Sequence, residues 1–140
     1  MGMGINTIIM KTVYKRRVQF YETDAQGIVH HSNYFRYFEE ARGELLRAIG
    51  YPYSKLREDG YDVVLLEARC QFKRPIYYDE VVCIETKLTH MDRFIFSFEY
   101  ILMVESQIRA LGSTRHCIIN KGSVVSIPQK VRELFTKLDL

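Results

Sequence analysis

YETDAQGIVHHSNYFRYFEEARGELLRAI, residues 21–49, is the stretch that decides the fold of this chain of 140 residues. From residue 34 onward its apolar side chains recur every three or four positions, which is the period of one buried helix face. The positions expected to be buried are Tyr34, Phe38, Ala41, Leu45 and Ile49, with Phe35, Tyr37, Leu46 and Ala48 widening the stripe. Much of the remaining surface is charged and carries Arg36, Glu39, Glu40, Arg42, Glu44 and Arg47.

The sequence marks both ends of this helix. Ser32 or Asn33 can accept a hydrogen bond from the first unpaired backbone N–H groups, which predicts the start. Gly50, followed by Pro52, predicts the end. The polar loop before the helix carries Asp24, so a carboxylate is expected close upstream of a helix N-terminus.

Length and composition indicate one globular domain, residues 1–140, with residues 1–11 as a loose N-terminal extension. Hydrophobic residues make up 47% and charged residues 26%, which is typical of a soluble protein. A net charge of only +3 is far from the strongly basic charge that is typical of nucleic-acid-binding domains, so no nucleic-acid partner is expected. No apolar run approaches the ~20 residues of a membrane span, and no signal peptide is recognisable. These features predict a cytoplasmic protein.

The three cysteines, Cys70, Cys83 and Cys117, are an odd number with wide spacing in apolar, strand-like contexts. This pattern lacks the spacing of metal ligands. It predicts buried free thiols in a reducing compartment, with no metal and no cofactor.

The order of elements predicts an α+β fold. Segments rich in β-branched and aromatic residues, which either alternate with polar residues or form apolar runs, predict strands. These segments are residues 12–21, 63–74, 81–90, 94–104 and 108–120. Helical turns are expected over 53–59, and an amphipathic helix over 128–138. Four consecutive strands joined by short turns pair antiparallel, and the long helix must bury its apolar face against one side of that sheet. Gly112 predicts a bulge or a close approach of backbone within its strand.

The predicted strands are long, about ten residues against a usual five or six. Such strands must curve, and an open edge invites pairing with a second copy of the chain. We therefore expect a homodimer with continuous sheets.

The motif Tyr21-x-x-Asp24-x-x-Gly27-Ile28-Val29-x-His31-x-x-Tyr34-x-x-x-Phe38-Glu39-x-Ala41-Arg42 resembles that of the hotdog-fold acyl-CoA thioesterases. The closest type is the 4-hydroxybenzoyl-CoA thioesterase family, in its Tol-Pal-associated subfamily. The resemblance extends from about residue 13 to the end. It implies the hotdog fold, a curved antiparallel β-sheet wrapped around a long central α-helix. It also implies an acyl-CoA substrate, no cofactor, and a homo-oligomer (a dimer or a tetrameric dimer of dimers) with shared active sites.

Thioester hydrolysis requires a polarised carbonyl oxygen and delivery of water or another nucleophile to the carbonyl carbon. Unpaired N–H groups and the dipole at the helix start can supply the first, and Asp24 can supply the second as general base or nucleophile. The resemblance implies Asp24 and His31 as catalytic residues, with the backbone N–H of His31 in the polarising role. The substrate-binding residues that we expect beside them are Tyr21, Gly27, Ile28, Val29, His30, Ser32, Asn33 and Arg74.

Other readings stay open. Glu39 and Glu40 are alternative carboxylates, because another hotdog branch uses a glutamate on the central helix, although Glu39 with Arg42 is most simply a helix ion pair. The basic candidates for the CoA phosphates are Arg69, Lys73, Arg74, Arg93 and Arg115. The alternative functions are a hotdog hydratase/dehydratase and a non-catalytic acyl-CoA, acyl-carrier or envelope-complex binding module.

Overall fold

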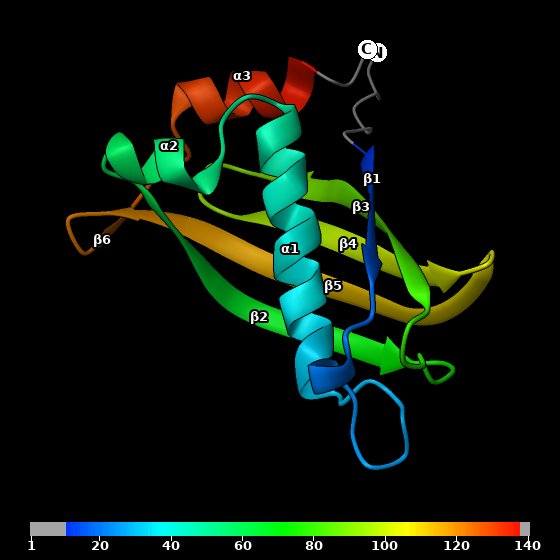
Figure 1. The fold of residues 1–140 in the computed structure, drawn as a ribbon. Coiled ribbons are helices and arrows are strands. Elements are labelled where there is room, and N and C mark those ends of the chain that lie inside the picture. The colour runs from blue at the N-terminus through cyan, green and yellow to red at the C-terminus, as the bar shows by residue number, and fades with distance from the viewer. Residues whose placement is uncertain (1–10, 138–140) are drawn as a thin grey trace.

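The computed structural model describes residues 11–137, in which one long helix, α1 (Ser32–Ala48), crosses one face of an antiparallel sheet that curves around it (Figure 1). The strands are β1 (Lys11–Arg17), β2 (Asp62–Phe72), β3 (Val81–Met91), β4 (Phe96–Val104), β5 (Gln107–Asn120) and β6 (Ser123–Val125). The shorter helices are α2 (Tyr53–Glu58) and α3 (Gln129–Lys137). The strand order is β1-β3-β4-β5-β2, with β6 beside β5, and every pair is antiparallel. The α+β class is confirmed.

The strand predictions differ from the structure at the N-terminus and before α3. The first strand ends at Arg17, where its ladder with β3 runs out at Val81, and residues Phe20–Glu22 form a 3₁₀ turn instead of continuing it. The short strand β6 was missed. Lys11, expected in the loose extension, is the first residue of β1, and the rest of that extension lies outside the described residues.

Helix α1 buries the face that its periodicity predicts. The five residues of the predicted stripe are buried, and Tyr37 and Leu46 join them in the core, whereas Phe35 and Ala48 remain exposed. Arg42 corrects the prediction for the charged face, because it is only 7% exposed. No helix within residues 11–137 is long and apolar enough to cross a membrane.

The cysteines are free, but they are not equally buried. Cys117 is buried, as predicted, whereas Cys70 and Cys83 are only partly buried. Burial raises the pKa of the Cys70 thiol to about 11, so this thiol stays protonated near neutral pH.

Gly112 is a point of close approach between β5 and α1, and the strand pairing is regular there. The rings of Phe38 and Tyr100 stack with centroids 4.5 Å apart in the core. A Cβ atom added to Gly112 would lie 2.1 Å from Cζ of Phe38. The sequence prediction of a close approach is therefore confirmed, and the reason is the volume of the Phe38 ring.

We expect Gly112→Ala to lower the free energy of unfolding by about 1–3 kcal/mol, because Phe38 must move within a packed core. Urea unfolding followed by circular dichroism measures this change. Gly43→Ala is the matched control, since a Cβ there would meet Tyr53 at an ordinary 3.7 Å and alanine favours the helix. Equal stability of the two variants would contradict the close-contact explanation.

Candidate active site

The loop before α1 is a tight hairpin that pairs with residues 76–78. Thr23 and Val29 form an antiparallel bridge, and the Asp24 N–H donates to the Ile28 carbonyl at 2.9 Å. Gly27 turns the chain with a φ of +80°, a conformation that glycine adopts without steric cost. Ile28 also bridges to Tyr77, so both sides of the hairpin are fixed.

The Asp24 side chain is exposed and shapes its own loop. One carboxylate oxygen accepts the Gln26 N–H at 2.8 Å, which is an Asx turn. No arginine, lysine or histidine among the described residues forms an ion pair with Asp24. The other carboxylate oxygen therefore keeps its hydrogen-bonding capacity for a water or a substrate.

The start of α1 corrects the predicted cap. His31 is the N-cap residue, and neither Ser32 nor Asn33 caps the helix with its side chain. Instead Nδ1 of His30 accepts the Ser32 N–H at 3.2 Å and lies 2.8 Å from the Ser32 hydroxyl. The N–H groups of Asn33 and Tyr34 donate to the carbonyls of His30 and His31. The His31 N–H has no hydrogen-bond partner among residues 11–137.

A groove of about 290 Å³ opens at this helix start. Its walls are Ile28, Val29, His31, Tyr34, Phe72, Lys73, Arg74 and Pro75. The rings of Tyr34 and Phe72 meet edge to face at 4.8 Å, and burial raises the pKa of Tyr34 to about 12, so its phenol is neutral. The groove is thus mainly apolar and aromatic, with His31, Lys73 and Arg74 also in its lining.

The groove brings together Ile28, Val29, His31, Lys73 and Arg74 of the predicted residues, and it adds Tyr34, Phe72 and Pro75. Asp24 and Gly27 lie on the adjoining hairpin and do not line the groove. Tyr21 is 79% exposed in the 3₁₀ turn. Asn33 is buried and donates to the Glu22 carbonyl at 2.9 Å, while His30 and Ser32 bond to each other. The aromatic pair could not be read from the sequence, because Tyr34 and Phe72 are brought together only by tertiary packing.

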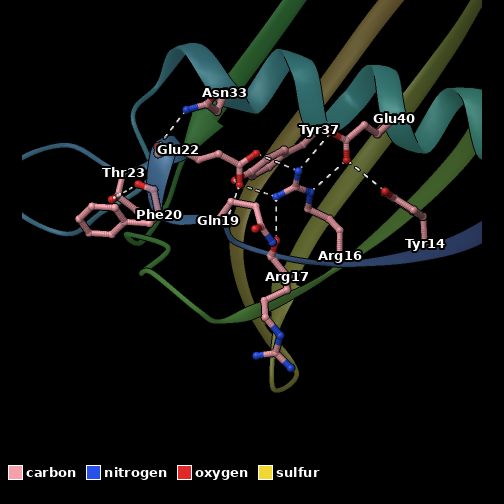
Figure 2. Close-up of polar contacts among 10 residues, drawn as sticks. All are labelled: Tyr14, Arg16, Arg17, Gln19, Phe20, Glu22, Thr23, Asn33, Tyr37 and Glu40. Atoms are coloured by element: carbon pink, nitrogen blue, oxygen red, sulfur yellow. Dashed lines mark hydrogen bonds and ion pairs between the residues drawn. The ribbon is translucent and has the colours of Figure 1, made fainter.

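A buried ionic cluster that the sequence analysis missed holds the hairpin against α1 (Figure 2). Arg16 of β1 lies between Glu22, which precedes the hairpin, and Glu40 of α1, at N–O distances of 2.8 Å and 3.0 Å. Its guanidinium also sits 4.3 Å from the centroid of the Tyr37 ring. The Glu22 carbonyl accepts the His30 N–H and the Asn33 side chain, so one residue ties both ends of the hairpin to the helix start.

Glu22 is only 5% exposed and is charged in spite of its burial. Burial opposes ionisation, but hydrogen bonds from Arg16, the Gln19 N–H and Tyr37 outweigh it and lower the pKa of Glu22 below its ordinary value. The same contact with Glu22, together with burial, raises the pKa of Tyr37. The only sequence signal for this cluster was the inward position of Arg16 in the alternating pattern of its strand.

No group of three or more His, Cys, Asp or Glu side chains among residues 11–137 is arranged to hold a metal ion.

Comparison with known proteins identifies relatives along most of the chain. It is 56% identical to a putative esterase of Aquifex aeolicus (strain VF5) over 89% of this chain and 98% of the relative. It is 32% identical to a 1,4-dihydroxy-2-naphthoyl-CoA hydrolase of Prochlorococcus marinus (strain MIT 9303), over 76% of each chain. The solved structure of a gentisyl-coenzyme A thioesterase matches with a TM-score of 0.82 at 33% identity, over 86% of this chain and 99% of that one.

Residues 18–135 match the family described as the Thioesterase-like superfamily. This range includes the hairpin, all of α1 and the strands from β2 to β6. The chain belongs to the Thioesterase-like superfamily of hotdog-fold proteins, and its relatives include hydrolases of coenzyme A thioesters.

Proposed function

We propose that this protein hydrolyses the thioester of an acyl-coenzyme A to the free acid and coenzyme A. The observation that supports this most directly is the unpaired His31 N–H at the positive end of α1, bordering an apolar groove. An amide in that position stabilises a carbonyl oxygen as it gains negative charge. The relatives that act on CoA thioesters support the same reaction class.

Asp24 completes the reaction in one of two ways. As a general base it accepts a proton from water while the water oxygen bonds to the carbonyl carbon, and the C–S bond then breaks as Asp24 returns that proton to the departing sulfur of coenzyme A. As a nucleophile it attacks the carbonyl carbon, the C–S bond breaks to expel the coenzyme A thiolate, and water then hydrolyses the resulting anhydride to the free acid and the Asp24 carboxylate. Both routes need a free carboxylate oxygen on the hairpin, and Asp24 has one.

The walls of the groove favour an aromatic acyl group. Tyr34 and Phe72 present ring faces and edges, against which an aryl group packs with more contact than a short alkyl chain. Lys73 and Arg74 are exposed at the same groove, and this exposure supports the proposal that they bind the phosphates of coenzyme A. Within the superfamily, we assign the chain to the 4-hydroxybenzoyl-CoA thioesterase family, Tol-Pal-associated subfamily. The basis of this assignment is the motif that runs from Tyr21 to Arg42.

A thiol-release assay tests this function. Aromatic, short-chain and long-chain acyl-CoAs are incubated with the protein, and free coenzyme A is measured with a chromogenic disulfide. We expect turnover, with aromatic acyl-CoAs having the highest kcat/KM. Binding of acyl-CoA without thiol release would favour a non-catalytic module, and hydration of an enoyl-CoA would favour the hydratase.

We also expect the protein to be a homo-oligomer with sites shared between subunits. Among the described residues β2 pairs only with β5, so its outer edge is open, and Leu65, Leu66 and Phe72 on this strand are exposed. An open apolar edge of this length is a pairing site for a second strand. Light scattering after size exclusion is expected to give at least twice the mass of one chain.

Leu65→Lys is expected to weaken this association by at least about tenfold, because a charge would be buried at the interface. Val13→Lys is the matched control, since Val13 is comparably exposed on β1 at the opposite edge of the sheet. A strictly monomeric wild-type protein would refute the shared-site arrangement.

A further inference from the structure

A second pocket lies beside the C-terminal half of α1. Its volume is about 340 Å³, and it is lined by residues of α1, α2, the start of β2 and β5, including Glu39, Arg42, Tyr53, Asp62, Val63 and His116. Arg42 lies ten residues after the start of α1, about 15 Å along the helix axis. Within one chain the pocket is therefore separate from the groove at the helix N-terminus, and Leu65 of its lining belongs to the β2 edge at which we expect a second copy to pair.

Arg42 is buried in this pocket without a carboxylate at hydrogen-bonding distance. Its Nε donates to the Tyr53 hydroxyl at 2.6 Å and its Nη1 to the Tyr100 hydroxyl at 3.1 Å. The nearest carboxylate is that of Glu39, 3.9 Å from Nη2 on a side chain that is 74% exposed. Buried charges in proteins are normally paired, because an isolated charge in a low-dielectric environment is costly. Arg42 thus lacks the counter-ion that its burial calls for.

A chain of hydrogen bonds beneath Arg42 has a defined direction. Arg42 can only donate, so the Tyr100 hydroxyl accepts a hydrogen bond from it. The Tyr100 hydroxyl in turn donates a hydrogen bond to Oγ1 of Thr114 at 2.6 Å. The Thr114 hydroxyl then donates to Nε2 of His116 at 2.8 Å. This order gives each hydroxyl proton an acceptor and leaves the imidazole hydrogen of a neutral His116 on Nδ1.

His116 is neutral and has a hydrogen-bond donor left over. Burial and the charge of Arg42 lower its pKa to about 3. The backbone of Val64 lies near the ring and partly opposes this shift, but no hydrogen bond of normal geometry joins them. Nδ1 of His116 therefore has no hydrogen-bond partner among the described residues, and the atom itself is buried.

The pocket consequently offers donors inside and acceptors only at its rim. Arg42 has an unused Nη2, and the Tyr53 hydroxyl accepts from Arg42, which leaves its own proton for a ligand. At the rim, Asp62 is paired with Arg57 at 3.5 Å, and Glu39 extends into solvent. A ligand that fits this pattern accepts hydrogen bonds and carries a single negative charge, since a dianion would meet the two rim carboxylates.

We propose that this pocket binds a small monocarboxylate, whose oxygens accept hydrogen bonds from Arg42 and Tyr53 while its apolar body packs on Val63. The planar guanidinium matches the two oxygens of a carboxylate. The carboxylate belongs either to a free acid or to the far end of an acyl group. Binding of a free acid does not depend on thioesterase activity.

Benzoate is the probe, and benzamide is its uncharged counterpart of the same shape. Calorimetric titration is expected to show benzoate binding to the wild-type protein at least about tenfold more tightly than benzamide. Arg42→Gln should weaken benzoate binding by at least about tenfold, and Tyr53→Phe, which keeps the ring in place, by a smaller factor. Arg47→Gln is the matched control, because Arg47 is an exposed arginine on the same helix. Benzoate should also shift the ring nitrogen resonances of His116.

Equal binding of benzoate and benzamide, or equal effects of Arg42→Gln and Arg47→Gln, would overturn the proposal. So would a wild-type protein that binds no benzoate and whose oligomeric mass changes on Arg42→Gln, because the counter-ion would then be a carboxylate of a second copy. Acyl-CoAs with and without a terminal carboxylate separate the two sources once binding is shown. A KM raised by Arg42→Gln only for the carboxylated substrate identifies the far end of an acyl group, and an unchanged KM identifies a free acid.

Discussion

Asp24→Asn is expected to reduce kcat for acyl-CoA hydrolysis by about 10²–10⁴-fold, because the amide can act neither as a base nor as an attacking carboxylate. The change isolates the charge. An asparagine oxygen still accepts the Gln26 N–H, so the Asx turn and the hairpin are preserved. Steady-state kinetics with the best acyl-CoA of the panel measures kcat and KM, and KM is expected to change little.

The control for this variant is Asp79→Asn, the same chemical change at an exposed site whose positive φ of 68° suits asparagine. It is expected to leave kcat unchanged, and both variants should unfold within about 0.5 kcal/mol of the wild type. Full activity in Asp24→Asn would remove Asp24 from the mechanism and leave Glu39 and Glu40 as the candidate catalytic carboxylates. Heavy oxygen found in Asp24 after a single turnover in heavy-oxygen water would identify the nucleophilic route, with water attacking the Asp24 carbonyl of the anhydride, since general-base catalysis puts the label only in the product acid.

Glu22→Gln is expected to lower the free energy of unfolding by about 3 kcal/mol, which corresponds to a fall in Tm of about 10 °C. The substitution keeps the shape of the side chain but removes one charge from a buried ion pair with Arg16. Arg16 keeps Glu40 as a partner, so the cost is at the lower end for such a change. Chemical unfolding at neutral pH measures it, with Glu40→Gln as the matched control.

Glu40→Gln should cost no more than about 1 kcal/mol, because the Glu40 side chain is 36% exposed and its ion pair is partly screened by water. The pH dependence gives a further test. The folded-state pKa of Glu22 lies below its ordinary value of 4.5, so its stabilisation is complete above that pH and is lost as the pH falls through the folded-state pKa. The difference between wild type and Glu22→Gln should therefore shrink below about pH 4.5. A difference that is constant with pH would rule out the ionised Glu22 as its cause.

The sequence by itself determined the elements whose burial repeats along the chain. The three-and-four spacing of Tyr34, Phe38, Ala41, Leu45 and Ile49 predicted α1 nearly to its ends, because each position reports the same buried face. Alternation in the strands and the glycine opposite Phe38 were readable for the same local reason. The motif from Tyr21 to Arg42 also placed the candidate carboxylate of Asp24 a short distance before the candidate helix amide of His31 in the sequence.

Only the tertiary structure decided which polar groups meet. Arg16 reaches Glu40 across 24 positions because the register of β1 on β3 and the packing of α1 bring them together. Arg42 falls on the charged side of the helical pattern, yet it is buried and donates to Tyr53 and Tyr100. These two tyrosines belong to other elements, so the spacing of residues along α1 gives no information about them. His31, and not Ser32 or Asn33, is the N-cap of α1, and the His30 side chain accepts the Ser32 N–H, since several side chains could accept this N–H and the packing of the hairpin selects one. Periodic burial is a local property of a sequence, whereas partners in a polar network depend on how distant segments are placed in space.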